Sequence, residues 1–148
     1  MGNDKVDIAK TNILLSIHDL TTITKNRGDN RSAAKLTAQA HILEGLDQRI
    51  ERSQLPDGFV RSVINDVRLE VLIILADMKF VLTLEKQELI APTSKLRQEA
   101  HNRLVEIRGE GGVEFDNEDP ARRTKHSVVE NDLKGLSSVE HLLHENLL

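Results

Sequence analysis

Two groups of acidic residues have the types and spacing that could hold a metal ion. Glu44 and Asp47 lie one turn apart in one helix-forming segment, and Asp66 and Glu70 lie one turn apart in the next. If the two segments form an antiparallel hairpin that turns at residues 54–58, the two acidic pairs come level with each other. Mg²⁺ prefers carboxylate oxygens as protein ligands, and a metal held there could activate water against a phosphate.

The order Glu44-x-x-Asp47, followed by Asp66-x-x-x-Glu70, resembles the paired acidic helices of the all-α nucleoside triphosphate pyrophosphohydrolases, the group of MazG and the dimeric dUTPases. That family carries ExxE and then ExxD. This sequence has Asp47 in place of the second Glu, and Asp66 and Glu70 are reversed and one residue further apart. The resemblance spans residues 44–70 and implies a Mg²⁺-dependent pyrophosphohydrolase with these four side chains as metal ligands.

A solvated helix surface explains the same acidic residues without a metal. Arginines that can form ordinary surface ion pairs are interleaved with them: Arg49, Arg52, Arg61 and Arg68. A helical wheel nevertheless places Asp47 about 40° from Leu43, nearer the apolar stripe than a solvated residue needs to be. We take the solvated surface, with no cofactor, as the first interpretation and the Mg²⁺ site as the alternative.

Composition excludes several classes of protein. The 148 residues include no Cys, which excludes disulfides and thiolate metal sites. Three Phe, no Trp and no Tyr, with a net charge of −4, argue against a nucleic-acid partner. The first ten residues carry charges where a signal peptide is apolar, and no segment has the run of about 18 apolar residues that a membrane span needs. We therefore expect a cytoplasmic protein with no membrane partner.

Apolar residues recur at helical spacing along almost the whole chain, which predicts an all-α fold. The expected helices cover residues 4–25, 32–52, 57–90, 92–108 and 127–148. Gly28 is expected to end the first helix, and Ser32 is the expected N-cap of the second. An alternative reads residues 105–115 as a β-hairpin, because Val105, Ile107, Val113 and Phe115 alternate with polar residues.

The expected organisation is an antiparallel helical bundle of four main helices, a linker and a C-terminal arm. The bundle covers residues 1–108, and the flexible linker covers residues 109–126, with acidic residues first and basic residues after them. Residues 127–148 form an amphipathic helical arm. The sequence leaves open whether Gly135 breaks this arm, and whether the arm packs on its own bundle or on a second copy.

The helix expected at residues 57–90 is apolar on more than one side, most clearly in VLIILADMKFVL at residues 71–82. Two apolar rows need two sets of neighbours, so we predict a homo-oligomer. The predicted interface residues are Leu69, Ile73, Phe80 and Leu84 of this helix and Leu136, Leu143 and Leu147 of the arm. The alternative is that these rows are simply the core of one chain.

These observations favour a non-enzymatic helical-bundle interaction protein, whether adaptor, regulator or inhibitor. It would act by self-association and by docking a protein partner along an apolar groove.

Overall fold

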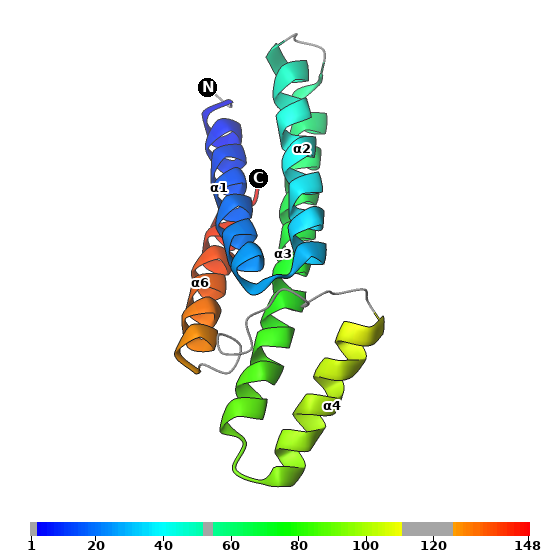
Figure 1. Cartoon of the computed structure of the whole chain (residues 1–148). Helices are drawn as coiled ribbons and strands as arrows, with labels where there is room; N and C mark the ends of the chain where they lie inside the picture. Colours follow the sequence, from blue (N-terminus) through cyan, green and yellow to red (C-terminus); the bar gives the residue numbers. More distant parts are fainter. Residues whose placement is uncertain (1–2, 52–54, 111–125) are drawn as a thin grey trace.

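The computed structural model describes the backbone of residues 3–51, 55–110 and 126–148, and their side chains except those of residues 3–4, 47–51, 108–110 and 126. These residues form the helices α1 (Asn3–Arg27), α2 (Asn30–Glu51), α3 (Asp57–Ile90), α4 (Ser94–Glu110) and α6 (His126–Glu145), with no strand among them (Figure 1). The all-α prediction is confirmed. Residues 105–110 are helical, so the β-hairpin alternative is wrong there, and Val113 and Phe115 lie outside the described residues.

The turn between α1 and α2 is made by Gly28 and Asp29. Gly28 has a φ of 75°, a left-handed conformation that glycine adopts without steric cost. The Asp29 side chain accepts a hydrogen bond from the Ser32 backbone N–H at 3.1 Å, so Asp29 is the N-cap of α2. The prediction of Ser32 as the cap is wrong, because Asp29 stands three residues earlier and already satisfies the Ser32 amide.

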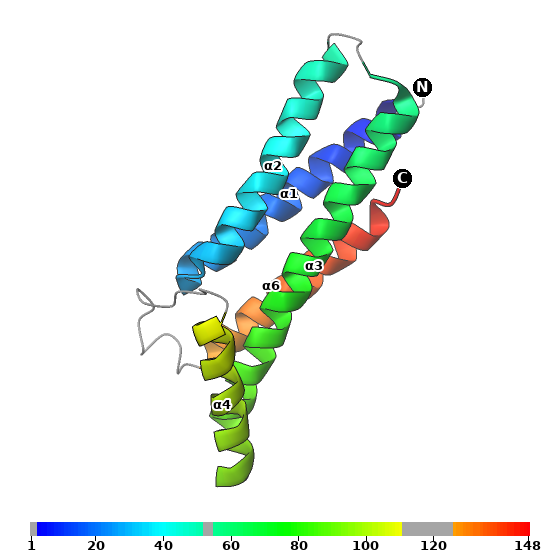
Figure 2. The same ribbon diagram turned by 90° about the vertical axis from the view of Figure 1, so that its right-hand side faces the viewer.

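Helices α1, α2 and α6 pack with residues 60–82 of α3 around one apolar core. Figures 1 and 2 show α6 lying alongside α1 and α3. The largest fully buried apolar side chains of this core are Ile13, Leu20, Leu36, Leu43, Ile64, Leu75, Leu82, Leu136 and Leu143. The C-terminal helix therefore packs on its own chain, and α6 continues through Gly135 without a break.

Helix α4 lies outside this core. It packs along the C-terminal part of α3 and runs in the opposite direction (Figure 1). Helix α4 was expected among the four main helices of the bundle, but none of its described side chains belongs to this core, whereas α6 contributes four. The reason lies in their apolar stripes. Helix α6 buries Val129, Leu136, Val139 and Leu143, whereas the buried hydrophobic residues of α4 are Ala100 and Leu104. The short apolar stripe of α4 is wide enough to pack against one neighbouring helix but not against two.

A buried ion pair joins three helices at the end of the core. Arg27 Nη2, on the last residue of α1, lies 2.6 Å from Glu85 Oε1 of α3, and these side chains are 6% and 2% exposed. Arg27 Nη1 also lies 3.7 Å from Asp132 Oδ2 of α6. A buried charge is costly unless it is paired, and the pairing of Arg27 links α1 with both α3 and α6.

Polar side chains hold the other end of α6. Asn65 donates to the Leu148 carbonyl oxygen and accepts from the Leu148 backbone N–H, both at 3.0 Å. Arg68 is buried and donates to the Leu143 carbonyl oxygen at 3.5 Å. The expectation that Arg68 forms a surface ion pair is therefore wrong, and its charge instead lies at the C-terminal end of a helix, where a cation is favourable.

Within the described residues, no helix is both long enough and apolar enough to cross a membrane.

Candidate interaction surface

The outer row of α3 consists of Leu69, Ile73, Ala76 and Phe80, spaced four, three and four residues apart on one face of the helix. Its three large side chains are half exposed: Leu69 at 50%, Ile73 at 55% and Phe80 at 50%. The opposite face of α3 packs in the core. Residues 71–82 are therefore apolar on two faces for different reasons. One face is buried in the core of the chain, and the other face, the outer row, is only partly covered.

The covered part lies at the C-terminal end of the outer row. Leu84 follows Phe80 by one turn but is only 4% exposed, and Ala100 and Leu104 of α4 are buried as well. Since α4 packs along this part of α3, it closes the face at Leu84 and leaves Leu69 and Ile73 uncovered. Burial therefore changes along the row where α4 ends.

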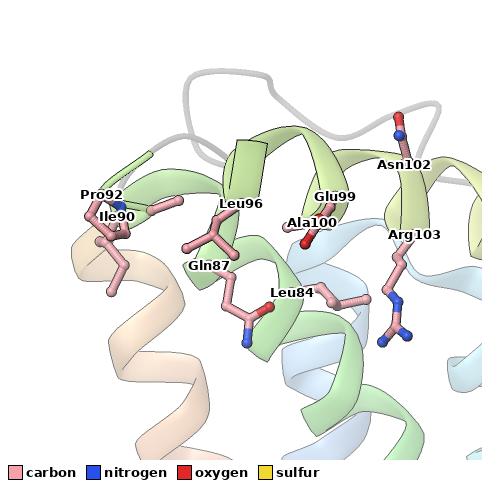
Figure 3. Close-up of a pocket in the computed structure, with 10 residues that line it drawn as sticks. Leu84, Gln87, Ile90, Pro92, Leu96, Glu99, Ala100, Asn102 and Arg103 are labelled. Carbon is pink, nitrogen blue, oxygen red and sulfur yellow. The ribbon is translucent and has the colours of Figure 1, made fainter. Parts of the chain in front are cut away.

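A cavity of about 620 Å³ opens between the end of α3 and the start of α4. Figure 3 shows Leu84 and Gln87 of α3 lining it together with Leu96 and Arg103 of α4. Gln87 follows Phe80 by seven residues, so Gln87 and Phe80 lie on the same face of α3. Leu96 of α4 is 48% exposed. The outer row and this cavity together form one surface, which we call the outer surface.

Acidic side chains follow one edge of the outer row, and a basic side chain lies beside the cavity. Asp66, Glu70 and Asp77 are exposed. Asp66 and Glu70 precede Ile73 by seven and three residues, and Asp77 follows it by four, so all three lie along one edge of the outer row. Beside the cavity, Arg103 and Glu99 of α4 both belong to its lining and are exposed. None of these five side chains has an ion-pair partner within the described part of the chain. Their charges are therefore available to a partner.

The predicted interface residues divide between the surface and the core. Leu69, Ile73 and Phe80 lie on the outer surface, and Leu147, just after α6, is 62% exposed. The Leu148 backbone is held by Asn65, one turn before Leu69, so Leu147 lies near the Leu69 end of α3. The other three predicted residues, Leu84, Leu136 and Leu143, are buried within the chain.

The predicted metal ligands remain on the surface where they are described. Glu44, Asp66 and Glu70 are exposed, and the side chain of Asp47 lies outside the described residues. Among the described side chains, no group of three or more His, Asp or Glu residues is arranged to hold a metal ion.

The cavity and the position of Arg103 beside it were not predicted from the sequence. The available signal was the composition of residues 94–110, which combine few apolar residues with several basic ones. Such a segment cannot bury two faces, so it pointed to a helix with a solvated side.

Comparison with known proteins identifies no relative: no protein-family model, curated protein or solved structure matches this chain.

Proposed function

We propose that this chain is a non-enzymatic helical interaction protein that self-associates through the outer surface and docks a protein partner there. The observation that carries the proposal is the outer row, in which three large apolar side chains are half exposed on one face of the longest helix. Single exposed apolar residues are ordinary on protein surfaces, but a contiguous apolar patch beside a cavity is typical of an interaction site.

The size of the patch supports self-association. A large side chain exposes roughly 200 Å² when fully free, so half exposure leaves about 100 Å² on each. Leu69, Ile73, Phe80, Leu96 and Ile90, which is 52% exposed, thus offer about 500 Å² per copy. Two copies would bury about 1,000 Å² of apolar surface, and their polar edges bring the total to the lower end of stable interfaces, at about 1,200 Å². A reversible dimer is the expected result.

Replacing Phe80 with Asp tests the proposal, because a charge in place of the largest apolar side chain of the row opposes burial against a partner. Light scattering during size-exclusion chromatography should give the Phe80→Asp variant the monomer mass of 16.6 kDa, and the unmodified chain a larger mass. Circular dichroism should show unchanged helix content, since Phe80 is half exposed in the folded chain.

Leu15→Asp is the matched control. Leu15 is a large apolar residue of α1 that is 52% exposed and lies outside the outer surface. This variant should keep the mass of the unmodified chain. Equal effects of Phe80→Asp and Leu15→Asp would show that the loss does not come from the outer surface, and the proposal would fail.

A further inference from the structure

We infer that the partner on the outer surface is a second copy of this chain, bound with its α3 antiparallel about a two-fold axis at Ala76. In this arrangement, α4 of each copy covers the Leu69 end of the other copy's outer row, and Arg103 of each copy meets Asp66 and Glu70 of the other. The inference rests on the self-association proposed above and adds its geometry.

The one-sided position of α4 favours an antiparallel partner. Helix α3 has 34 residues, and α4 covers the outer face only at its C-terminal end. A partner whose α3 runs in the opposite direction brings its own α4 to the N-terminal end of that face, where Leu69 and Ile73 are uncovered. A parallel partner would place both α4 helices at the same end and leave this region without a helix.

The order of side-chain sizes along the row favours a crossing at Ala76. Ala76 is the smallest member and lies between Ile73 and Phe80. Two helices that cross at Ala76 can approach closely there, and the antiparallel direction then sets Ile73 of one copy near Phe80 of the other. Large side chains thus pack beside each other on both sides of a close contact, as in interdigitated helix pairs.

The levels of the charged side chains along α3 also favour the antiparallel direction. Leu84 lies eight residues after Ala76, so an axis at Ala76 brings it level with position 68 of the other copy, eight residues before Ala76. Arg103 lines the same cavity as Leu84 (Figure 3), and Asp66 and Glu70 stand on either side of position 68. In a parallel pair these levels would be about 24 Å apart along α3. The antiparallel pair therefore brings together opposite charges that lack ion-pair partners within the described chain.

Single cysteines test the direction cleanly, since the chain has none of its own. Under mild oxidation, Ala76→Cys should form a disulfide-linked dimer, because the two positions face each other at the axis. Leu69→Cys should not, because the antiparallel arrangement separates the two positions by about 21 Å along α3, and a disulfide needs Cα atoms within about 7 Å. A disulfide through Leu69→Cys, or none through Ala76→Cys, would overturn the inference.

Charge reversal tests the contact itself. Arg103→Glu and Glu70→Arg should each raise the dimer dissociation constant by about tenfold, because each places like charges together. Combining both changes in one chain should restore most of the affinity. Arg97→Glu is the matched control, since it makes the same change of charge about 120° away around α4 and should leave the dissociation constant unchanged.

The outcomes separate this inference from the proposed function. If Phe80→Asp dissociates the dimer while the double charge reversal restores nothing, self-association through the outer surface stands and the antiparallel arrangement is refuted. If the unmodified chain is a monomer at every concentration, both are refuted.

Discussion

Replacing Arg27 with Met should be among the most destabilising single changes in this chain. It removes the cation that lies 2.6 Å from Glu85, a carboxylate whose side chain is only 2% exposed. Breaking a buried pair by removing one partner costs about 3–5 kcal/mol, because the remaining charge stays buried. For a domain of this size, each kcal/mol lowers the melting temperature by roughly 2–4 °C. We therefore expect a decrease of about 6–20 °C, measured by circular dichroism.

Two further variants show whether the ion pair is responsible. The double variant Arg27→Met, Glu85→Met should recover much of the loss, because apolar side chains replace both charges in the same buried space. Arg61→Met is the exposed counterpart, since Arg61 lies 3.1 Å from Asp57 with side chains 35% and 60% exposed. Solvent screening limits the cost of losing such a pair to about 1 kcal/mol or less. If Arg27→Met loses no more stability than Arg61→Met, the buried ion pair does not have the predicted role.

Three other predictions concern two helical glycines, the end of α6 and the acidic residues. Gly45→Ala should raise the free energy of unfolding by about 1 kcal/mol, since nothing lies within 4 Å of the added Cβ. Gly135→Ala should raise it less, because its Cβ would lie 3.2 Å from Ile23 Cδ1. Equal gains in the two variants would contradict this prediction. Asn65→Ala should speed amide hydrogen exchange in the last turn of α6 more than in the rest of the core. An equal increase in exchange throughout the core would contradict this prediction. Millimolar Mg²⁺ should leave the melting temperature unchanged, whereas a rise of several degrees that is lost in Glu70→Gln would favour the pyrophosphohydrolase alternative.

The positions of the helices could be predicted from the sequence because helix formation follows local apolar spacing. The bounds of α3, at residues 57 and 90, match the prediction, and the short turns after α1 and α3 carry Gly28 and Pro92. The choice of neighbours could not be predicted in the same way. Residues 94–110 and 126–145 compete for one place beside α3, and the outcome depends on how much apolar surface each can bury there.

The same limit applies to the outer surface. Spacing alone placed Leu84 in one row with Leu69, Ile73 and Phe80, and it cannot show that α4 buries Leu84 and leaves the others half exposed. Leu136 lies on the apolar stripe of α6, and such a stripe serves equally well for packing within a chain or between two chains. Which one it serves is decided by tertiary packing.

Sedimentation equilibrium of the unmodified chain over a range of concentrations tests the central claim most directly. If the outer surface joins two copies, the average mass should rise with concentration from 16.6 kDa toward twice that value, and Phe80→Asp should hold it at 16.6 kDa over the same range. A mass of 16.6 kDa for the unmodified chain at every concentration would contradict the account.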